Sequence, residues 1–404
     1  MRILFCSRRF FPAISGMSVY AVNLLKELVD AGHDVTLVSQ YRADPVGTGI
    51  YGGGPPPSVP GVRVIGRRSE GEETGGDFER DVEDLVTTIA AEHALKPFDV
   101  LHAQYGYPTG WAVVLAGQKL GVPTVVSIQG GDGHWVGSCC ETHRLAMLRV
   151  LQGANAVLIG CASFRDEVVE RLGVDPGLFR LVPGAVDTGQ FHPAGDHVPG
   201  VAGEPPRLLY HGRVDRRKGA LDFLDALAML PPDSYAATIS GIGPDLEPAR
   251  AKAEALQLDV RFSGYSPYEE APTRYREADI FVSPTYAEGF SNTVLEAMAS
   301  GLPILSCDAV GVRDCLRNED NALLTQPGDI AAQAAALARL LADRPLRARL
   351  SATALAECRE TYSWRTVAGL IMDTYAEVAS RAPNPVDPVL PVTECRFRAA
   401  PHLL

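Results

Sequence analysis

Two glutamates lie eight positions apart, one in a predicted loop and one in the helix after it, in the run Glu288-Gly289-Phe290-Ser291-Asn292-Thr293-Val294-Leu295-Glu296. Gly289 and Ser291 suit a loop whose backbone approaches a ligand closely, and Ser291 or Asn292 can cap the helix. Exposed N–H groups at a helix N-terminus bind anions. The segment therefore offers one carboxylate before an anion site and another about two turns into the helix. That arrangement suits a nucleotide sugar.

A second half-site lies upstream, where an apolar strand pattern leads into Gly212-Arg213 and Lys218-Gly219 opens the next helical stretch. An arginine and a lysine at the carboxyl end of a strand, beside the start of a helix, suit a crevice that neutralises phosphate. Arg216 and Arg217 lie in the same turn. A solvated basic turn is therefore the alternative interpretation.

Short apolar runs alternate with helical patterns along the chain, which is typical of parallel α/β units. The strands expected in the first half are 2–7, 34–39, 62–65, 98–102, 123–128, 155–159 and 179–182. Those expected in the second half are 207–211, 235–240, 259–263, 279–283, 303–306 and 322–325. The segment between them is rich in Pro, Gly and charge without periodicity, so an interdomain linker is predicted at 193–206.

Composition narrows the class of protein. A chain of 404 residues, 46% hydrophobic and 21% charged, is typical of a globular enzyme with two or three domains. The sequence contains no run of 18 apolar residues, so no transmembrane helix is expected. The net charge of −12 argues against a nucleic-acid partner. The eight cysteines show no metal-ligand spacing. They are interpreted as reduced thiols of a cytoplasmic protein.

A dinucleotide site is a competing interpretation, because Gly241-Ile242-Gly243 follows a predicted strand. The Gly-x-Gly-x-x-Gly pattern is incomplete, since position 246 is Leu. The loop after the first strand lacks the pattern as well. A tight turn into a helix at 245–256 is the preferred interpretation.

From these residues the chain resembles the retaining glycosyltransferases of family 4. The resemblance spans residues 1–381, and Gly212-Arg213 with Lys218-Gly219 and the Glu-x7-Glu segment are its specific motifs. It implies an α/β protein of the GT-B fold, in which two Rossmann-like domains face each other across a cleft. The domains would be an acceptor-binding domain at 1–192, a nucleotide-sugar-binding domain at 207–362, a helix at 363–381 packing back on the first domain, and a tail at 382–404.

The resemblance also implies a role for each site residue. Arg213 and Lys218 would hold the donor diphosphate, Glu288 would contact the donor sugar, and Glu296 would accept hydrogen bonds from the ribose hydroxyls. Gly16 would lie under the diphosphate in the loop after the first strand. The remaining donor contacts would come from backbone groups of Gly212, Gly289, Phe290, Ser291, Asn292, Thr293 and Val294. Two fixed cations would replace a catalytic metal, so no metal and no other cofactor is expected.

Three positions depart from the usual pattern of the family. Met17 follows Gly16 where a second glycine is common, Asp314 stands where Glu is usual, and Gln129 occupies a position that is often His. Glutamine can exchange hydrogen bonds with a sugar but cannot be a cation. Gln129, Asp132 and His134 are predicted to contact the acceptor or the sugar.

The function implied is retaining transfer of a hexose or N-acetylhexosamine from a UDP- or GDP-sugar to a hydroxyl of a small-molecule or glycan acceptor. Two alternatives stay open at this point. One is a GT-B epimerase that inverts C2 of a nucleotide sugar. The other is a non-catalytic protein that binds a nucleotide sugar.

Overall fold

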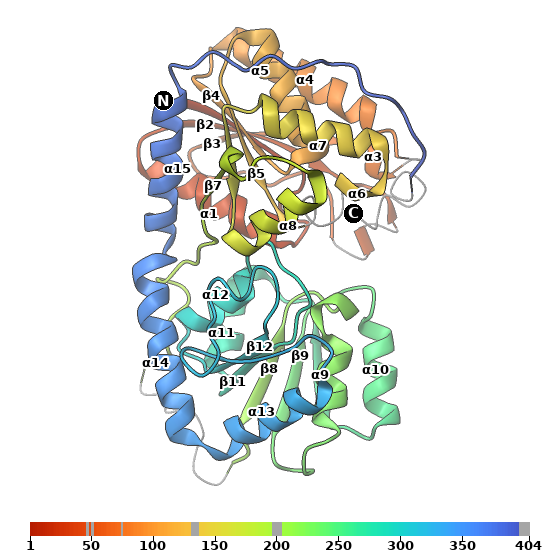
Figure 1. Ribbon diagram of the computed structural model, residues 1–404, viewed down its shortest axis with the longest axis vertical. Helices are drawn as coiled ribbons and strands as arrows, with labels where there is room; N and C mark the ends of the chain where they lie inside the picture. Colours follow the sequence, from red (N-terminus) through yellow and green to blue (C-terminus); the bar gives the residue numbers. More distant parts are fainter. Residues whose placement is uncertain (46–47, 50–51, 74–75, 131–136, 196–203, 396–404) are drawn as a thin grey trace. The chain divides into compact units, whose positions relative to one another are not determined.

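The structure is a computed structural model that describes all residues except 46–47, 50–51, 74–75, 131–136, 196–203 and 396–404. The chain forms two compact units (Figure 1). Unit 1 contains Met1–Pro183 and Val367–Leu404, and unit 2 contains Gly184–Thr366. Among the described residues, no helix has the length and apolar character needed to span a membrane.

Unit 1 is built on a seven-stranded parallel sheet of order β3-β2-β1-β4-β5-β6-β7. Its strands are β1 (Arg2–Ser7), β2 (Asp34–Tyr41), β3 (Val62–Arg68), β4 (Val100–Gln104), β5 (Thr124–Ile128), β6 (Ala156–Ile159) and β7 (Phe179–Leu181). The strand order reverses between β1 and β4. Open α/β sheets bind ligands at such a reversal, beyond the carboxyl ends of the strands.

Unit 2 contains a six-stranded parallel sheet of order β10-β9-β8-β11-β12-β13. Its strands are β8 (Arg207–His211), β9 (Ala236–Ser240), β10 (Val260–Gly264), β11 (Ile280–Ser283), β12 (Ile304–Cys307) and β13 (Leu323–Thr325). The reversal here falls between β8 and β11. The strands of both sheets lie within a few residues of the segments predicted from the sequence, which confirms two Rossmann-like α/β units.

Helices connect the strands and cover both faces of each sheet (Figure 1). In unit 1 they are α1 (Gly16–Asp30), α3 (Glu70–Glu73), α4 (Phe78–Leu95), α5 (Trp111–Leu120), α6 (Gly137–Cys139), α7 (Glu141–Gly153) and α8 (Ala162–Leu172). In unit 2 they are α9 (Ala220–Leu227), α10 (Leu246–Ala255), α11 (Ala271–Arg276), α12 (Asn292–Ala299), α13 (Ile330–Ala342) and α14 (Arg344–Thr361), and α15 (Trp364–Val378) runs from unit 2 into unit 1.

Side chains of β8 alternate between two apolar cores, as the period of a strand requires. Leu208 and Tyr210 are buried in the cluster with α9 and α13, and Leu209 is buried in the cluster with α12 and α14. The central strand is thus apolar on both faces between Arg207 at its amino end and His211 at its carboxyl end. That end carries the candidate site of unit 2.

Unit 2 begins before the linker predicted at 193–206. The Val186 N–H donates to Tyr362 O at 2.9 Å, and Phe191 is buried with Tyr275 at a ring-centroid distance of 5.6 Å. These contacts tie residues 184–192 to unit 2. The division of the chain therefore falls between Pro183 and Gly184.

The second part of α15 belongs to unit 1, where it completes a buried polar contact. Tyr375 Oη lies 2.5 Å from His102 Nδ1, and Ser127 Oγ lies 2.7 Å from His102 Nε2. Burial lowers the pKa of His102 to about 3, so the ring is neutral. Both ring nitrogens of this central-strand residue are therefore hydrogen-bonded, and one partner comes from the C-terminal helix.

Candidate functional site

An ion pair joins the two halves of the predicted site in unit 2. The Nζ of Lys218 lies 2.6 Å from Glu288 Oε2, and it donates to the carbonyl of Ala287 at 3.3 Å. Lys218 follows β8 and Glu288 follows β11, the two strands between which the order reverses. The half-sites that were predicted separately thus meet at the expected ligand position of the sheet.

Close backbone packing fixes this pair. Gly219 has a φ of +73°, and a Cβ there would lie 2.0 Å from Pro284 O. A Cβ on Gly311 would lie 2.1 Å from Glu288 O, and the Glu288 N–H donates to Val310 O at 2.9 Å. The loops after β8, β11 and β12 therefore touch through their backbones. Only glycine permits that approach at these two positions.

The basic turn after β8 is organised by two carboxylates. Arg217 pairs with Asp215 at 2.9 Å and Arg216 with Asp245 at 3.0 Å, while Arg213 Nε lies 3.3 Å from Asp215. Burial acts to raise the pKa of Asp215, but the hydrogen bonds from Arg217 and the arginine charges outweigh it and leave the pKa below its ordinary value. Asp215 is therefore an anion that holds Arg213 beside the site. The side chains of Arg216 and Arg217 are 72% and 44% exposed, so that part of the turn is solvated, as the alternative interpretation has it. Arg213 and Lys218 are less exposed, at 32% each.

Helix α12 buries the second glutamate of the motif. Glu296 Oε2 accepts a hydrogen bond from Tyr275 Oη at 2.7 Å. Burial raises the pKa of Glu296 to about 7, although the Tyr275 bond works in the opposite direction. A carboxyl with this pKa exchanges its proton near neutral pH, and it can accept hydrogen bonds from a ligand hydroxyl once ionised.

The side chains of other residues in the motif make packing and polar contacts within unit 2. Val294 is fully buried in the core, and Phe290 packs against Tyr362 at a ring-centroid distance of 5.6 Å. Ser291 occupies the N-cap position of α12, and its Oγ lies 3.3 Å from Thr293 Oγ1. The Val294 side chain is therefore part of the core, and the Phe290 side chain is partly buried against it.

The Gly241-Ile242-Gly243 run has a packing role. A Cβ on Gly241 would lie 1.8 Å from Gly212 O, and one on Gly243 would lie 2.2 Å from Val214 O. The loop after β9 thus lies directly against the loop after β8. These glycines keep the loop that carries Arg213 in place, which explains them without a dinucleotide site.

The predicted residues of unit 1 are less fully placed. Gly16 is the exposed first residue of α1 rather than a loop residue, because Ser15 caps the helix by accepting from the Ser18 N–H at 3.2 Å. Gln129 directly follows β5. Asp132 and His134 lie outside the described residues.

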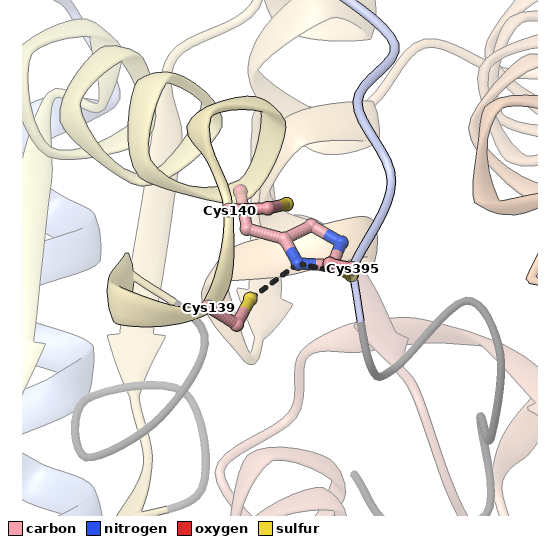
Figure 2. A group of neighbouring side chains, drawn as sticks. Cys139, Cys140 and Cys395 are labelled. Atoms are coloured by element: carbon pink, nitrogen blue, oxygen red, sulfur yellow. Dashed lines mark hydrogen bonds between the residues drawn. The ribbon is translucent and has the colours of Figure 1, made fainter.

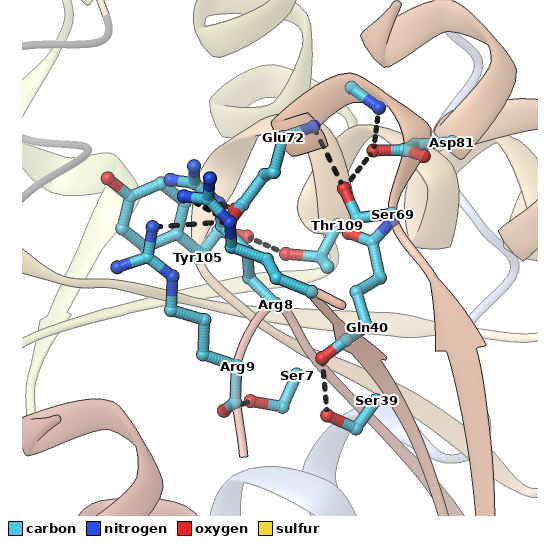
Figure 3. Close-up of polar contacts among 12 residues, drawn as sticks. Ser7, Arg8, Arg9, Ser39, Gln40, Ser69, Glu72, Asp81, Tyr105 and Thr109 are labelled. Carbon is cyan, nitrogen blue, oxygen red and sulfur yellow. Dashed lines mark hydrogen bonds and ion pairs between the residues drawn. The ribbon is translucent and has the colours of Figure 1, made fainter. Parts of the chain in front are cut away.

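A buried charge cluster at the carboxyl edge of the first sheet was not predicted (Figure 3). Glu72 lies 2.6 Å from Arg8, 3.2 Å from Arg9 and 3.9 Å from Arg42. These four residues and Gln40 help to line one pocket. Burial acts to raise the pKa of Glu72, but the three arginines lower it further than burial raises it.

The sequence did contain part of this signal. Arg8 and Arg9 directly follow the first strand, as Arg213 follows the strand of the second half. Their partner Glu72 is 64 positions from Arg8, and no local spacing relates the two. The cluster offers cationic groups and a carboxylate at the ligand-binding edge of unit 1.

Comparisons with known proteins agree with this geometry. Residues 15–185 match the family described as "Glycosyl transferase 4-like domain", and residues 196–356 match "Glycosyl transferases group 1". The chain is 28% identical to glycogen synthase of Mycobacterium tuberculosis, over 98% of this chain and 99% of that protein. It is 26% identical to D-inositol 3-phosphate glycosyltransferase of Xylanimonas cellulosilytica, over 91% and 93%.

The chain is a family 4 glycosyltransferase. Solved structures agree on the fold of this glycosyltransferase. Sucrose-phosphate synthase from Thermosynechococcus elongatus aligns with a TM-score of 0.75 and 24% identity, covering 93% of this chain and 98% of that one. HepE of Anabaena, solved with UDP and glucose, aligns with a TM-score of 0.71 and 17% identity, covering 93% and 100%. The fold is GT-B, and the enzyme class is glycosyl transfer.

The charge cluster generates a prediction about the stability of the glycosyltransferase. Glu72→Gln leaves three arginines around a neutral side chain, so we expect a loss of about 3–5 kcal/mol in unfolding free energy at neutral pH, measured by denaturant titration. The folded-state pKa of Glu72 lies below its ordinary value of 4.5. The contribution of the ionised Glu72 to the unfolding free energy is therefore fully present above pH 4.5 and is lost as the pH falls through the lowered pKa.

The matched control is Asp30→Asn, which neutralises an acid of the same unit in the exposed Lys26–Asp30 pair. Exposed pairs contribute about 0–1 kcal/mol, so this variant should unfold almost like the parent. Equal losses in the two variants would contradict the assignment of a buried charge cluster to Glu72.

Proposed function

We propose that the enzyme transfers a hexose or N-acetylhexosamine from a UDP- or GDP-sugar to a hydroxyl of a small-molecule or glycan acceptor, with retention at the anomeric carbon. The observation that carries the proposal is the Lys218–Glu288 pair at 2.6 Å. It brings a cation that would neutralise phosphate next to a carboxylate that would bind the sugar, where the strand order of unit 2 reverses. Family membership supports the reaction class.

In this proposal the cations stabilise the leaving nucleoside diphosphate. Cleavage of the bond between the anomeric carbon and the phosphate oxygen leaves negative charge on that oxygen, which Lys218 and Arg213 would neutralise. An ammonium has three N–H donors. Within the described part of the chain, Lys218 uses donors on Glu288 and Ala287 O, so one remains for a phosphate oxygen.

The remaining donor contacts follow from α12 and the loop before it. Glu288, beside Lys218, would accept hydrogen bonds from sugar hydroxyls, and backbone N–H groups from Gly289 to Val294 would bind sugar and phosphate. Glu296 would accept from the ribose hydroxyls. The acceptor oxygen would attack on the face that the diphosphate leaves, and a departing phosphate oxygen would take the acceptor proton, so no side-chain nucleophile is needed.

We assign acceptor contacts to unit 1. Gln129, Asp132 and His134 follow β5, and Gln129 can both donate to and accept from a sugar hydroxyl. Gly16, at the N-terminus of α1, would lie beside the donor diphosphate. The transfer itself would use no metal or other cofactor, because Arg213 and Lys218 supply the positive charge.

A panel of nucleotide sugars tests the function. Thermal shift should identify the base, because a ligand at about 100 times its dissociation constant adds about 2.7 kcal/mol of stability. Transfer to an acceptor with the α-configured product, seen by NMR, would support the proposal. Release of a free 2-epimer without an acceptor, or binding without transfer or hydrolysis, would contradict it.

Lys218→Ala should lower turnover far more than nucleotide affinity. The leaving diphosphate gains charge in the transition state, and loss of one preorganised electrostatic donor costs roughly 10²–10³ in rate. Steady-state kinetics and calorimetry separate the two effects. Lys252→Ala is the matched control, because Lys252 is similarly exposed and pairs with Asp225 at 2.7 Å in the same unit. Near-parental turnover in Lys218→Ala would remove Lys218 from the site.

Activity should persist without added magnesium or manganese and after brief exposure to EDTA. The reason is that two fixed side-chain cations take the place of a metal at the diphosphate. Initial rates with and without chelator measure this directly. Loss of activity that magnesium or manganese restores would show that the donor is bound through a metal.

Nucleotide affinity should increase from pH 6 to pH 8 because of Glu296. Its pKa is about 7 without ligand, and the ionised form accepts the ribose hydroxyls, so raising the pH populates the binding form. One pH unit below that pKa, affinity should fall by up to about tenfold. Calorimetry at several pH values provides the measurement.

The phosphates of the nucleotide also ionise, and Glu296→Gln is the control for that effect. In this variant, nucleotide affinity should change with pH only as far as phosphate ionisation causes it. At pH 8 this variant should lose about 1.5–3 kcal/mol of affinity for the ribose nucleotide and little for its 2′,3′-dideoxy analogue. Additive losses for mutation and deoxygenation, or a lower melting temperature with unchanged affinity, would mean that Glu296 does not bind the ribose.

A further inference from the structure

Three cysteines and one histidine gather in unit 1, although the sequence analysis expected no metal site. Cys139 ends α6, Cys140 is the N-cap residue of α7, and His143 lies in the first turn of α7. Cys395 comes from the C-terminal tail, 252 positions from His143. Figure 2 shows the three thiols around the imidazole ring. None of the four belongs to the proposed donor or acceptor contacts.

The dimensions of the cluster fit a tetrahedral metal. One ligand atom from each of the four residues lies within 4.8 Å of the others. His143 Nδ1 lies 2.7 Å from Cys139 Sγ and 3.8 Å from Cys395 Sγ. Zinc bonds of about 2.3 Å to sulfur and about 2.0–2.1 Å to nitrogen give tetrahedron edges of about 3.6 Å between S and N and about 3.8 Å between two S. The four atoms therefore need only small side-chain rotations to surround one ion.

The histidine is held in a defined orientation. His143 is fully buried, and its ring packs against Tyr107 and Phe78 at centroid distances of 4.7 and 5.9 Å. Its Nδ1 faces the two sulfurs. The backbone changes from helical at Cys139 to extended at Cys140, which has φ −164° and ψ 167°. Two successive side chains can therefore reach one centre. One ligand position is thus preorganised, and the thiols lie on both sides of it.

The tail that brings Cys395 runs antiparallel to α7 (Figure 1). Asn155 donates to Ala382 O at 2.8 Å, Arg149 pairs with Asp387 at 2.7 Å, and Thr393 N–H donates to Thr142 Oγ1 at 2.9 Å. These contacts follow one another along the tail and end at the thiol cluster. Cys395 therefore reaches the cluster through specific contacts along α7.

Apolar burial gives this tail little of its order. Val389 and Val392 are 70% and 69% exposed, and Val386 is the tail residue that packs against Gly153. Fixing the backbone of one residue costs about 1–2 kcal/mol of conformational free energy. A metal bond at Cys395 would offset that cost at the far end of these contacts.

We propose that Cys139, Cys140, His143 and Cys395 bind one zinc ion that fastens the C-terminal tail to unit 1. Three thiolates and one imidazole are a ligand set that soft and borderline metals prefer, and four protein ligands make a closed structural site. This zinc takes no part in glycosyl transfer. A disulfide between Cys395 and Cys139 or Cys140 is the competing use of the same thiols.

The test is the metal content of the full-length protein, purified in reducing buffer without chelator. We expect about one zinc ion per chain by inductively coupled plasma mass spectrometry. Cobalt added to the zinc-free protein should give the visible absorption bands of a tetrahedral thiolate site. Cys395→Ser should lower zinc affinity by at least the ~10–100-fold that loss of an outer-shell partner costs, in competition with a zinc indicator.

Cys161→Ser is the matched control, because Cys161 is the N-cap of α8 and serine is favoured there. It should keep full zinc content. Hydrogen exchange gives a readout besides metal, since residues 382–395 should exchange faster in Cys395→Ser and in zinc-free protein but not in Cys161→Ser. Protein that binds no zinc after its addition, unchanged affinity in Cys395→Ser, or a disulfide at Cys395 under reducing conditions would overturn the proposal.

Discussion

Backbone contact between loops at the carboxyl edge of the second sheet is the constraint on which the candidate donor site depends. Pro284 O, Glu288 O and Gly212 O each lie about 2 Å from where a Cβ of a facing glycine would be. No side chain can separate these loops, so the residues beside the glycines have fixed positions. Lys218 and Glu288 are carried by loops in such contact, and their side chains meet at 2.6 Å. The chemistry of the site thus rests on steric exclusion of side chains from its base.

The six strands of the second sheet follow the order of the first six strands of the first sheet, but the charged side chains at the two reversals differ in burial. In unit 1, Arg8 is almost fully buried and is neutralised by Glu72. In unit 2, the side chains of Arg213 and Lys218 are each 32% exposed. Buried paired charges stabilise and shape a fold, whereas partly exposed cations can exchange a carboxylate or water for a phosphate. This difference supports assigning the donor to unit 2.

Local pattern accounts for what the sequence predicted well. Every strand of β8 to β13 was found because apolar runs bounded by turn residues are a local signal, and the Arg213–Lys218 and Glu288–Glu296 spacings are local too. The two contacts that were not predicted are long-range. The Arg8–Glu72 pair and the Cys395–His143 approach join residues 64 and 252 positions apart, and only the fold reveals them. Gly16 was placed in a loop because Ser15 was not recognised as the helix cap.

The contact between His102 and Tyr375 has a consequence for synthesis on the ribosome. His102 is made early, but its partner emerges only after all of Gly184–Thr366 has been translated. At roughly 5–20 residues per second, the nascent first sheet waits on the order of 10–40 seconds for the helix that covers it. During that interval Nδ1 of His102 lacks its Tyr375 partner, although Ser127 can already bond to Nε2. Unit 1 therefore completes its buried polar contacts only after the whole of unit 2 has been made.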